Sequence, residues 1–352
     1  MKNNTAQKRI EYFDLMKGFC IALVVISHCY EELDIRLSDE HLWSMLEHLR
    51  MPLYFFLSGM FFKQYSCFMD FVVRKTNKLI IPYAFFIFVT LIPKLIDGEI
   101  ACELIPMKKH VTWMIKYGGY LWFLRALFFA NILYYGYNKL VERRDFKVKV
   151  VILLAITATG WIIDRFMPVD GAFRSDYAYL TSAVCAFMVM PFFYVAQVLK
   201  EYLKTVENIN KVKLIPMFVV SVLVCYLTSH GGVYLVNAKV ENNLFLFYIA
   251  ALSAITAVWC VSVMINRLWY FSYIGRYSII VYLTHVPLLG YIVHEQLTHN
   301  VYVLMLMLLV LMPLMIWFFR RCFPAFVAQR DILKYDNGKM VLDKTVFSLK
   351  NK

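Results

Sequence analysis

The sequence predicts an all-α membrane protein, a polytopic bundle of about ten transmembrane helices with both termini in the cytoplasm. Three observations lead to this class. Hydrophobic residues make up 61% of the 352 residues and charged residues only 17%, far from the composition of a soluble domain. The apolar residues form stretches of about 17–22 residues, the length that crosses a bilayer as a helix. Basic residues gather in alternate connecting segments.

Each predicted span is one apolar stretch, and the stretches follow one another along most of the chain. They begin near Tyr12, Arg50, Leu79, Tyr120, Val148, Tyr177, Leu214, Leu244, Tyr277 and Val301. The first stretch is too long for the core of a signal peptide and lacks a small-residue cleavage site. We therefore expect it to be retained as a span.

The distribution of lysine and arginine predicts the orientation. With a cytoplasmic N-terminus, the inner segments are the first 17 residues, 63–78, 138–149, 200–213, 265–276 and 320–352. They contain about 27 of the 37 basic residues, as the positive-inside rule requires. The net charge of +13 is then explained by loops that face anionic lipid and anionic ligands, and no nucleic-acid-binding module is required.

The chain divides into a membrane domain, 1–321, and a short basic cytoplasmic tail, 322–352, in which DNGK predicts a turn. The eight cysteines contain no CxxC pair and most lie within predicted spans, so we expect no structural disulfide. The spacing typical of zinc ligands, a P-loop and a nucleophile elbow are all missing from the sequence. We therefore expect no metal.

Two ionisable residues share a face of the first span. Lys17 and His28 are eleven residues apart, which returns to within roughly 20° of the same face about 16 Å further along the helix. Ionisable groups inside a membrane are costly and usually functional. Histidine suits a general base near neutral pH, although a structural histidine bonded to a carbonyl remains an alternative for His28.

Two carboxylates follow this histidine. Glu31 and Glu32 lie at i+3 and i+4 from His28, where either could orient the ring or stabilise imidazolium. We assign Glu32 to the catalytic group, while a solvated helix end remains the alternative for these residues.

A basic cluster precedes the third span. Arg74, Lys75 and Lys78 crowd onto about one helical turn, and with Lys17 they suit phosphate groups. Any inner loop is basic, so the cluster alone is weak evidence. Together with His28 it fits acyl-coenzyme A, which has a phosphorylated head and a long arm with a reactive end.

Two further spans carry polar stripes. Ser278, Tyr282 and His285 are spaced i, i+4, i+7 in the ninth span, where they could position an acceptor or hold helices together. Trp122 and Arg125 share a side of the fourth span at i,i+3. They could bind a sugar, or form an interfacial aromatic belt with a snorkelling arginine.

Five segments together resemble the acyltransferase-3 family of multi-pass membrane O-acyltransferases. They are KGFCIALVVISH, MPLYFFLSGMFF, RKTNKLIIPY, LWFLRALF and FSYIGRYSIIVYLTHVPLL, in order from about Tyr12 to about Arg321. The resemblance implies a catalytic role for His28, with His285 as a second site residue, and coenzyme binding by Arg74, Lys75 and Lys78. Lys17 stands where the family usually has arginine. Lysine keeps the positive charge but lacks the planar guanidinium that binds two oxygens at once. Arg50 stands where some sugar-acetylating members carry histidine, and we expect it to bind the acceptor substrate.

The resemblance also implies the reaction. Such proteins move an acyl group, usually acetyl, from cytoplasmic acyl-coenzyme A to a hydroxyl of a glycan, which is extracytoplasmic or lipid-linked. We therefore expect acetyl-coenzyme A as donor, a location in the inner membrane, and a possible partnership with glycan polymerase or export machinery. The main alternative is a transporter or flippase for a glycan precursor, with His28, Arg50, Arg125 and His285 along its pathway. A membrane sensor or scaffold would leave the spacing of Lys17 and His28 unexplained.

Overall fold

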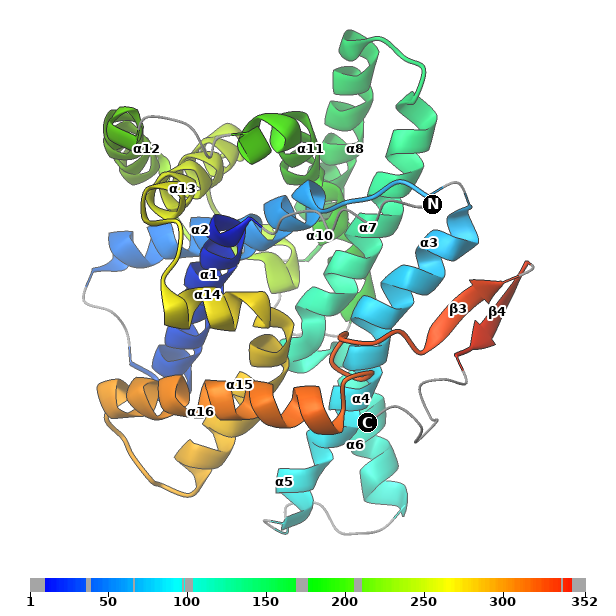
Figure 1. Ribbon diagram of the computed structural model, residues 1–352, viewed down its shortest axis with the longest axis vertical. Helices are drawn as coiled ribbons and strands as arrows, with labels where there is room; N and C mark the ends of the chain where they lie inside the picture. The colour runs from blue at the N-terminus through cyan, green and yellow to red at the C-terminus, as the bar shows by residue number, and fades with distance from the viewer. Residues whose placement is uncertain are drawn as a thin grey trace, which may run out of the picture.

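The computed structural model describes residues 10–35, 39–65, 67–96, 98, 104–168, 177–205, 211–336 and 338–343. The all-α prediction is confirmed, because the described chain is mainly helical with two short hairpins (Figure 1). The elements, in order, are α1 (Glu11–Glu32), α2 (Glu40–Met60), α3 (Phe68–Lys75), η1 (Thr76–Ile80), α4 (Ile81–Val89), α5 (Leu91–Ile96), α6 (Leu104–Tyr117), η2 (Gly119–Leu121), α7 (Trp122–Val141), α8 (Phe146–Phe166), α10 (Ala178–Met188), α11 (Met190–Thr205), η4 (Lys211–Lys213), α12 (Leu214–Thr228), β1 (Val233–Tyr234), η5 (Leu235–Asn237), β2 (Lys239–Val240), α13 (Leu244–Ile265), α14 (Trp269–Arg276), α15 (Ser278–His294), α16 (Val301–Cys322), β3 (Leu333–Asp336) and β4 (Lys339–Leu342).

The structure supports fewer membrane spans than the sequence predicts. Among the described residues, seven helical segments are long and apolar enough to cross a membrane, or eight if the pair α14–α15, bent by 90°, counts as one span. The other two predicted spans correspond to α2 and α7, which are helices of 21 and 20 residues. Both contain ionisable side chains, such as Glu47 in α2 and Arg125 in α7, and polar residues of this kind lower their hydropathy. Most predicted spans coincide with a helix, but the second, predicted to begin near Arg50, starts in the middle of α2, and the count of about ten spans is not confirmed.

Helix α1 lies at the centre of the bundle. Of its most apolar window, 72% is buried, against 17% for α8 and for α12, which lie at the periphery. The contact of α1 with α14 is made by backbone. A Cβ added at Gly18 would lie 2.0 Å from the carbonyl oxygen of Phe271, and one added at Gly275 would lie 1.9 Å from that of Asp14. Glycine is therefore required on both sides of this interface.

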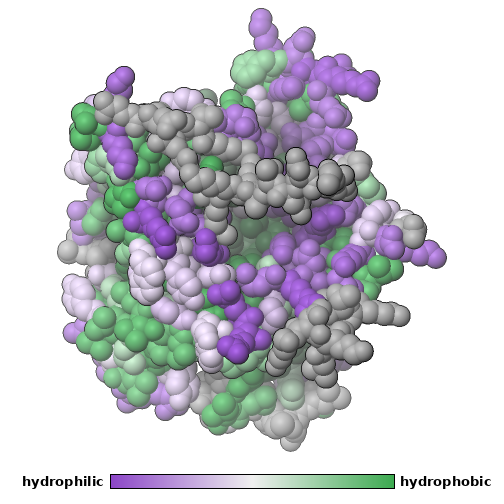
Figure 2. Space-filling view, in the orientation of Figure 1, coloured by the Kyte–Doolittle hydropathy of each residue, from purple (hydrophilic) through white to green (hydrophobic). Residues whose placement is uncertain are grey.

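The start of α1 and the end of α16 lie at the same end of the bundle. Arg276 forms ion pairs with Asp14 at 3.7 Å and with Glu11 at 3.9 Å, and Arg320 lies 4.2 Å from the ring centroid of the adjacent Tyr277. We call this end, which also carries Lys17 and Lys75, the basic end, and the opposite end, near His28, the histidine end. Figure 2 shows hydrophilic residues across the middle of one face and hydrophobic residues at its lower left.

The C-terminal segment folds back onto the bundle. Strands β3 and β4 pair antiparallel, with Asp336 opposite Lys339, in agreement with the turn expected at DNGK. Asn77 in η1 anchors the segment: its side-chain oxygen accepts the N–H groups of Ile332 at 2.8 Å and Leu333 at 2.9 Å, and its nitrogen donates to the carbonyl of Leu333 at 2.8 Å. The predicted tail thus contacts the bundle through residues 328–333, whereas β4 is exposed along its length, and residues 337 and 344–352 lie outside the described residues.

Candidate active site

His28 lies in the penultimate turn of α1 and is paired with a carboxylate. Its Nδ1 lies 3.2 Å from Oε2 of Glu31, and the His28 side chain is 33% exposed. A carboxylate can only accept a hydrogen bond, so Nδ1 carries the proton and Nε2 is left as the basic nitrogen. Glu31 is the carboxylate that contacts His28, so we assign the orienting role to Glu31 in place of Glu32. Glu32 is the last residue of α1 and is exposed.

Arg50 holds Glu31 against the bundle. One Arg50 nitrogen lies 3.7 Å from Oε1 of Glu31, and the other lies 3.6 Å from Oε1 of Glu47. Glu47 is buried and its second oxygen accepts the backbone N–H of Val233 at 2.9 Å. The Arg50 guanidinium also lies 5.2 Å from the ring centroid of Trp43. Arg50, for which we expected a role in substrate binding, is thus placed as a support for the His28–Glu31 pair.

His285 faces His28 from α15. The two ring centroids are 5.2 Å apart, although the residues are separated by most of the chain. Nδ1 of His285 lies 3.0 Å from the carbonyl oxygen of Val281, which fixes the proton on Nδ1 because a carbonyl only accepts. Nε2 is buried and has no hydrogen-bond partner among the described residues. A buried acceptor without a donor is costly, and this nitrogen can still accept one hydrogen bond.

The predicted stripe on α15 is present, but its members differ in role. The hydroxyl of Tyr282 donates to the carbonyl of Tyr120, and the hydroxyl of Tyr120 donates to the carbonyl of Leu283 at 3.1 Å. This reciprocal pair ties α15 to the start of α7, so Tyr282 holds helices together while its ring centroid lies 6.0 Å from that of His285. Ser278 begins α15 towards the basic end and is half-buried.

At the basic end, two of the four predicted coenzyme ligands lie against aromatic side chains at and near the C-terminus of α2. The Lys17 amine lies 4.3 Å from the ring centroid of Phe61. The Lys75 amine lies 5.8 Å from the ring centroid of Phe62 and 5.5 Å from that of Phe71. Among the described residues, Lys75 forms no ion pair with a carboxylate. A half-buried ammonium held only against aromatic faces is available to an anion.

The other two predicted ligands are paired with acidic residues. Nε of Arg74 donates to both carboxylate oxygens of Asp70 at 3.0 Å. The Lys78 amine lies 2.9 Å from Asp331 and donates to the carbonyl of Ala328 at 2.8 Å. In this arrangement, Lys78 binds the C-terminal segment. The sequence around Lys78 gives no indication of this contact, because Lys78 and Ala328 are 250 residues apart.

The structure buries Arg125 and bonds it to the neighbouring helices α10 and α6. This side chain is 4% exposed, and its Nε donates to the hydroxyl of Ser182 at 2.9 Å. Its terminal nitrogens donate at 3.3–3.4 Å to the carbonyls of residues 115, 116 and 117 at the end of α6. Arg125 therefore satisfies the exposed carbonyls of a helix C-terminus, and the predicted snorkelling is not observed. Trp122, at the start of α7, is half-buried with its ring centroid 6.1 Å from that of Phe123.

The described residues contain no group of three or more His, Cys, Asp or Glu side chains that could hold a metal ion. Seven cysteines are free, Cys29 among them, and Cys102 lies outside the described residues.

The arrangement at the histidine end is that of a general base: an imidazole with one nitrogen fixed on a carboxylate and the other available to remove a proton from a hydroxyl.

Comparison with known proteins agrees with this chemistry. No curated protein and no solved structure matches the chain. The family model described as "Acyltransferase domain" matches residues 10–320. The matched region includes His28 and His285, the basic residues Lys17 and Lys75, and the glycines at the contact between α1 and α14. The matched region covers most of the 352 residues, and the chain therefore belongs to the acyltransferase-3 family of multi-pass membrane acyltransferases.

Proposed function

We propose that the protein transfers an acetyl group from cytoplasmic acetyl-coenzyme A to a hydroxyl of a cell-surface or lipid-linked glycan, at the inner membrane. The observation that carries the proposal is the polarity of α1. One end of this buried helix presents Lys17 against Phe61, next to the Phe62 ring that Lys75 of α3 faces, and the other end presents His28 paired with Glu31. The two sites are about 16 Å apart along the helix, so a donor with a phosphorylated head and a long arm fits between them.

In the proposed reaction, phosphates of the donor bind Lys17 and Lys75, and the arm carries the thioester along α1 towards His28. Nε2 of His28 removes the proton from the acceptor hydroxyl, whose oxygen attacks the thioester carbonyl. The tetrahedral intermediate expels the coenzyme A thiolate, which takes the proton from the imidazolium to give the free thiol. Glu31 stabilises the imidazolium while it exists. The free Nε2 of His285 accepts a hydrogen bond from the acceptor and holds it in place.

Direct transfer of this kind requires no acyl-enzyme. The acceptor would reach His28 from the histidine end, where Arg50 and the segment around Val233 lie next to the catalytic pair. A glycan polymerase or an exporter that delivers the acceptor would be expected to act on that side.

The experiment is release of coenzyme A by the purified protein in nanodiscs, supplied with acetyl-coenzyme A and extracted surface glycan. Isotopic acetyl recovered in the glycan identifies the product. His28→Ala should abolish release, and the matched control His41→Ala should retain it, because His41 is a half-buried residue of the first turn of α2 that bonds the carbonyl of Tyr226. Undiminished transfer by a folded His28→Ala protein would refute the role of His28. Lack of release by the native protein, together with no binding of acetyl-coenzyme A, would favour the transporter alternative.

A further inference from the structure

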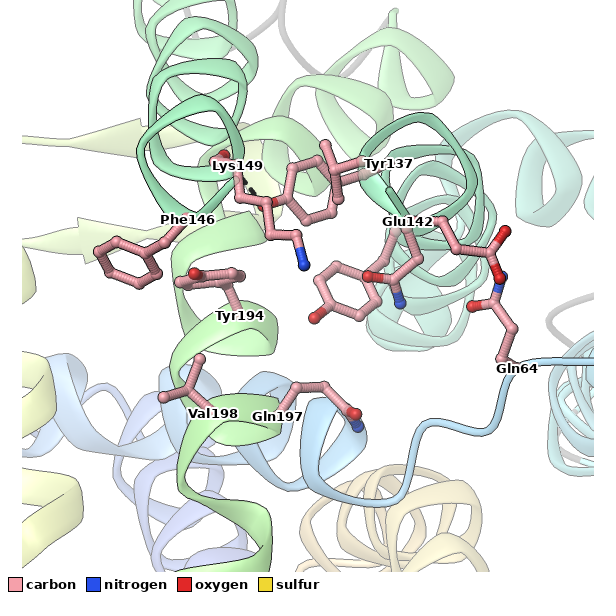
Figure 3. Close-up of a pocket in the computed structure, with 11 residues that line it drawn as sticks. Gln64, Tyr137, Glu142, Phe146, Lys149, Tyr194, Gln197 and Val198 are labelled. Atoms are coloured by element: carbon pink, nitrogen blue, oxygen red, sulfur yellow. Dashed lines mark hydrogen bonds between the residues drawn. The ribbon is translucent and has the colours of Figure 1, made fainter. Parts of the chain in front are cut away.

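A separate pocket lies at the basic end, between α7, α8 and α11. Its volume is about 520 Å³, and Tyr134, Tyr137 and Tyr194 contribute aromatic walls (Figure 3). The ring of Tyr134 also contacts Phe62, with centroids 4.9 Å apart, and Phe62 lies beside Lys75. The pocket therefore adjoins the basic end of the bundle and is remote from His28.

One uncompensated positive charge projects into this pocket. Figure 3 shows the amine of Lys149 directed towards the centre of the pocket, beside the ring of Tyr194. The carboxylate of Glu142, which also lines the pocket, lies 3.6 Å from the amine of Lys139. Lys149 itself forms no ion pair within the described part of the chain. Its backbone is held in place, because the hydroxyl of Tyr137 donates to its carbonyl at 3.0 Å.

The remaining polar lining suits a phosphate ester with hydroxyl groups. Gln197 uses its nitrogen to donate to the carbonyls of Gly59 and Phe62, so its side-chain oxygen is left to accept a hydrogen bond from a ligand hydroxyl. Asn138 and Tyr194 offer further donors around the Lys149 amine. The pocket thus combines the Lys149 cation with neutral donors and acceptors, while the one carboxylate in its lining, Glu142, is paired with Lys139. This set matches a headgroup with a single negative charge.

One side of the pocket opens onto apolar surface. Phe146 and Val198, which lie on the same side of the pocket in Figure 3, are 68% and 58% exposed. The exposed apolar side continues along α8 through Val151 and Leu154, and α8 is one of the peripheral candidate spans. In a membrane, such a surface faces the acyl chains of lipids. A water-soluble ligand would gain nothing from it.

We propose that this pocket binds the headgroup of an anionic phospholipid of the inner leaflet, with the phosphate on Lys149 and an acyl chain along Phe146, Val198 and α8. Basic pockets between transmembrane helices on the cytoplasmic side are suited to such headgroups. The surrounding segment, residues 139–149, has five basic and two acidic side chains, which attracts anionic lipid to this edge of the protein.

The test is lipid binding by the delipidated full-length protein in detergent, followed by native mass spectrometry during titration with phosphatidylglycerol or phosphatidylcholine. Lys149→Gln should weaken phosphatidylglycerol binding about fivefold, the effect of one charge near the membrane surface, and should leave phosphatidylcholine binding unchanged. Lys147→Gln is the matched control: it removes the same charge two residues away, from an exposed side chain that does not line the pocket. It should bind phosphatidylglycerol as the native protein does.

Equal binding by the native and Lys149→Gln proteins would overturn the proposal, and so would an equal loss in both variants, which would indicate diffuse charge attraction. Adenosine 3′,5′-bisphosphate represents the head of coenzyme A. If it displaced phosphatidylglycerol, the proposal would also be overturned, because the pocket would then bind the acetyl-coenzyme A donor. If Lys149→Gln does not yield folded protein, Val198→Asp serves instead: it places a negative charge at the exposed rim and should weaken phosphatidylglycerol binding selectively.

Discussion

Replacing Glu31 by glutamine tests the catalytic pair directly. The change keeps the size of the side chain and a neutral acceptor, but removes the negative charge 3.2 Å from Nδ1 of His28. Hydrogen bonds to charged groups contribute about 1.5–3 kcal/mol, and the side chain of Glu31 is 50% exposed, so solvent screening favours the lower value. A loss of about 1.5 kcal/mol in the transition state, where imidazolium forms, predicts about a tenfold fall in kcat/KM.

The assay is acetyl-coenzyme A turnover under the conditions that define the His28 dependence. Glu32→Gln is the matched control, because it makes the same change in charge at the next residue, and its kcat/KM should stay within about twofold of the native value. The KM for acetyl-coenzyme A should be unaffected in both variants, since the coenzyme phosphates bind at the other end of α1. Equal losses in the two variants, or a loss confined to Glu32→Gln, would refute the assignment of Glu31.

Three further outcomes follow from the packing and the basic end. Gly275→Ala forces a Cβ to within 1.9 Å of a backbone oxygen of α1 and should lower the yield of folded protein and its Tm, whereas Gly290→Ala, with no atom within 4 Å of the added Cβ, should leave both unchanged or slightly raised. Asn77→Ala leaves the buried N–H of Ile332 and the half-buried N–H of Leu333 without an acceptor and should cost about 2–3 kcal/mol, measured as faster hydrogen exchange in residues 332–336. Lys75→Gln should raise the KM for acetyl-coenzyme A about tenfold with little change in kcat, and Arg74→Gln should have a smaller effect because Arg74 is already paired with Asp70.

The sequence located the helices well because hydrophobic stretches of membrane length are a local signal. It also placed Lys17 and His28 on one helix, and Ser278, Tyr282 and His285 on another, since helical periodicity is local as well. It could not show that the two helices bring their histidines within 5.2 Å, which depends on the bend between α14 and α15 and on glycines that permit backbone contact.

The choice between Glu31 and Glu32 shows the same limit. An α-helix brings both i+3 and i+4 side chains near His28, so local geometry allows either pairing. Arg50 on α2 lies within 3.7 Å of Glu31, and this tertiary contact decides between them. Arg125 and Lys78 were likewise assigned to ligands because their partners, helix carbonyls and a distant C-terminal segment, leave no mark on the sequence nearby.

The close contact of α1 with α14 also sets the order in which the protein can be assembled. About 250 residues separate Gly18 from Gly275, which at about 5–20 residues per second takes about 12–50 s of synthesis. Until α14 emerges, Asp14 has no Arg276 beside it, and His28 has no His285 facing it. The first helix, with its ionisable residues, therefore stays without these partners through nearly the whole of translation, and a chain truncated before α14 would never supply them.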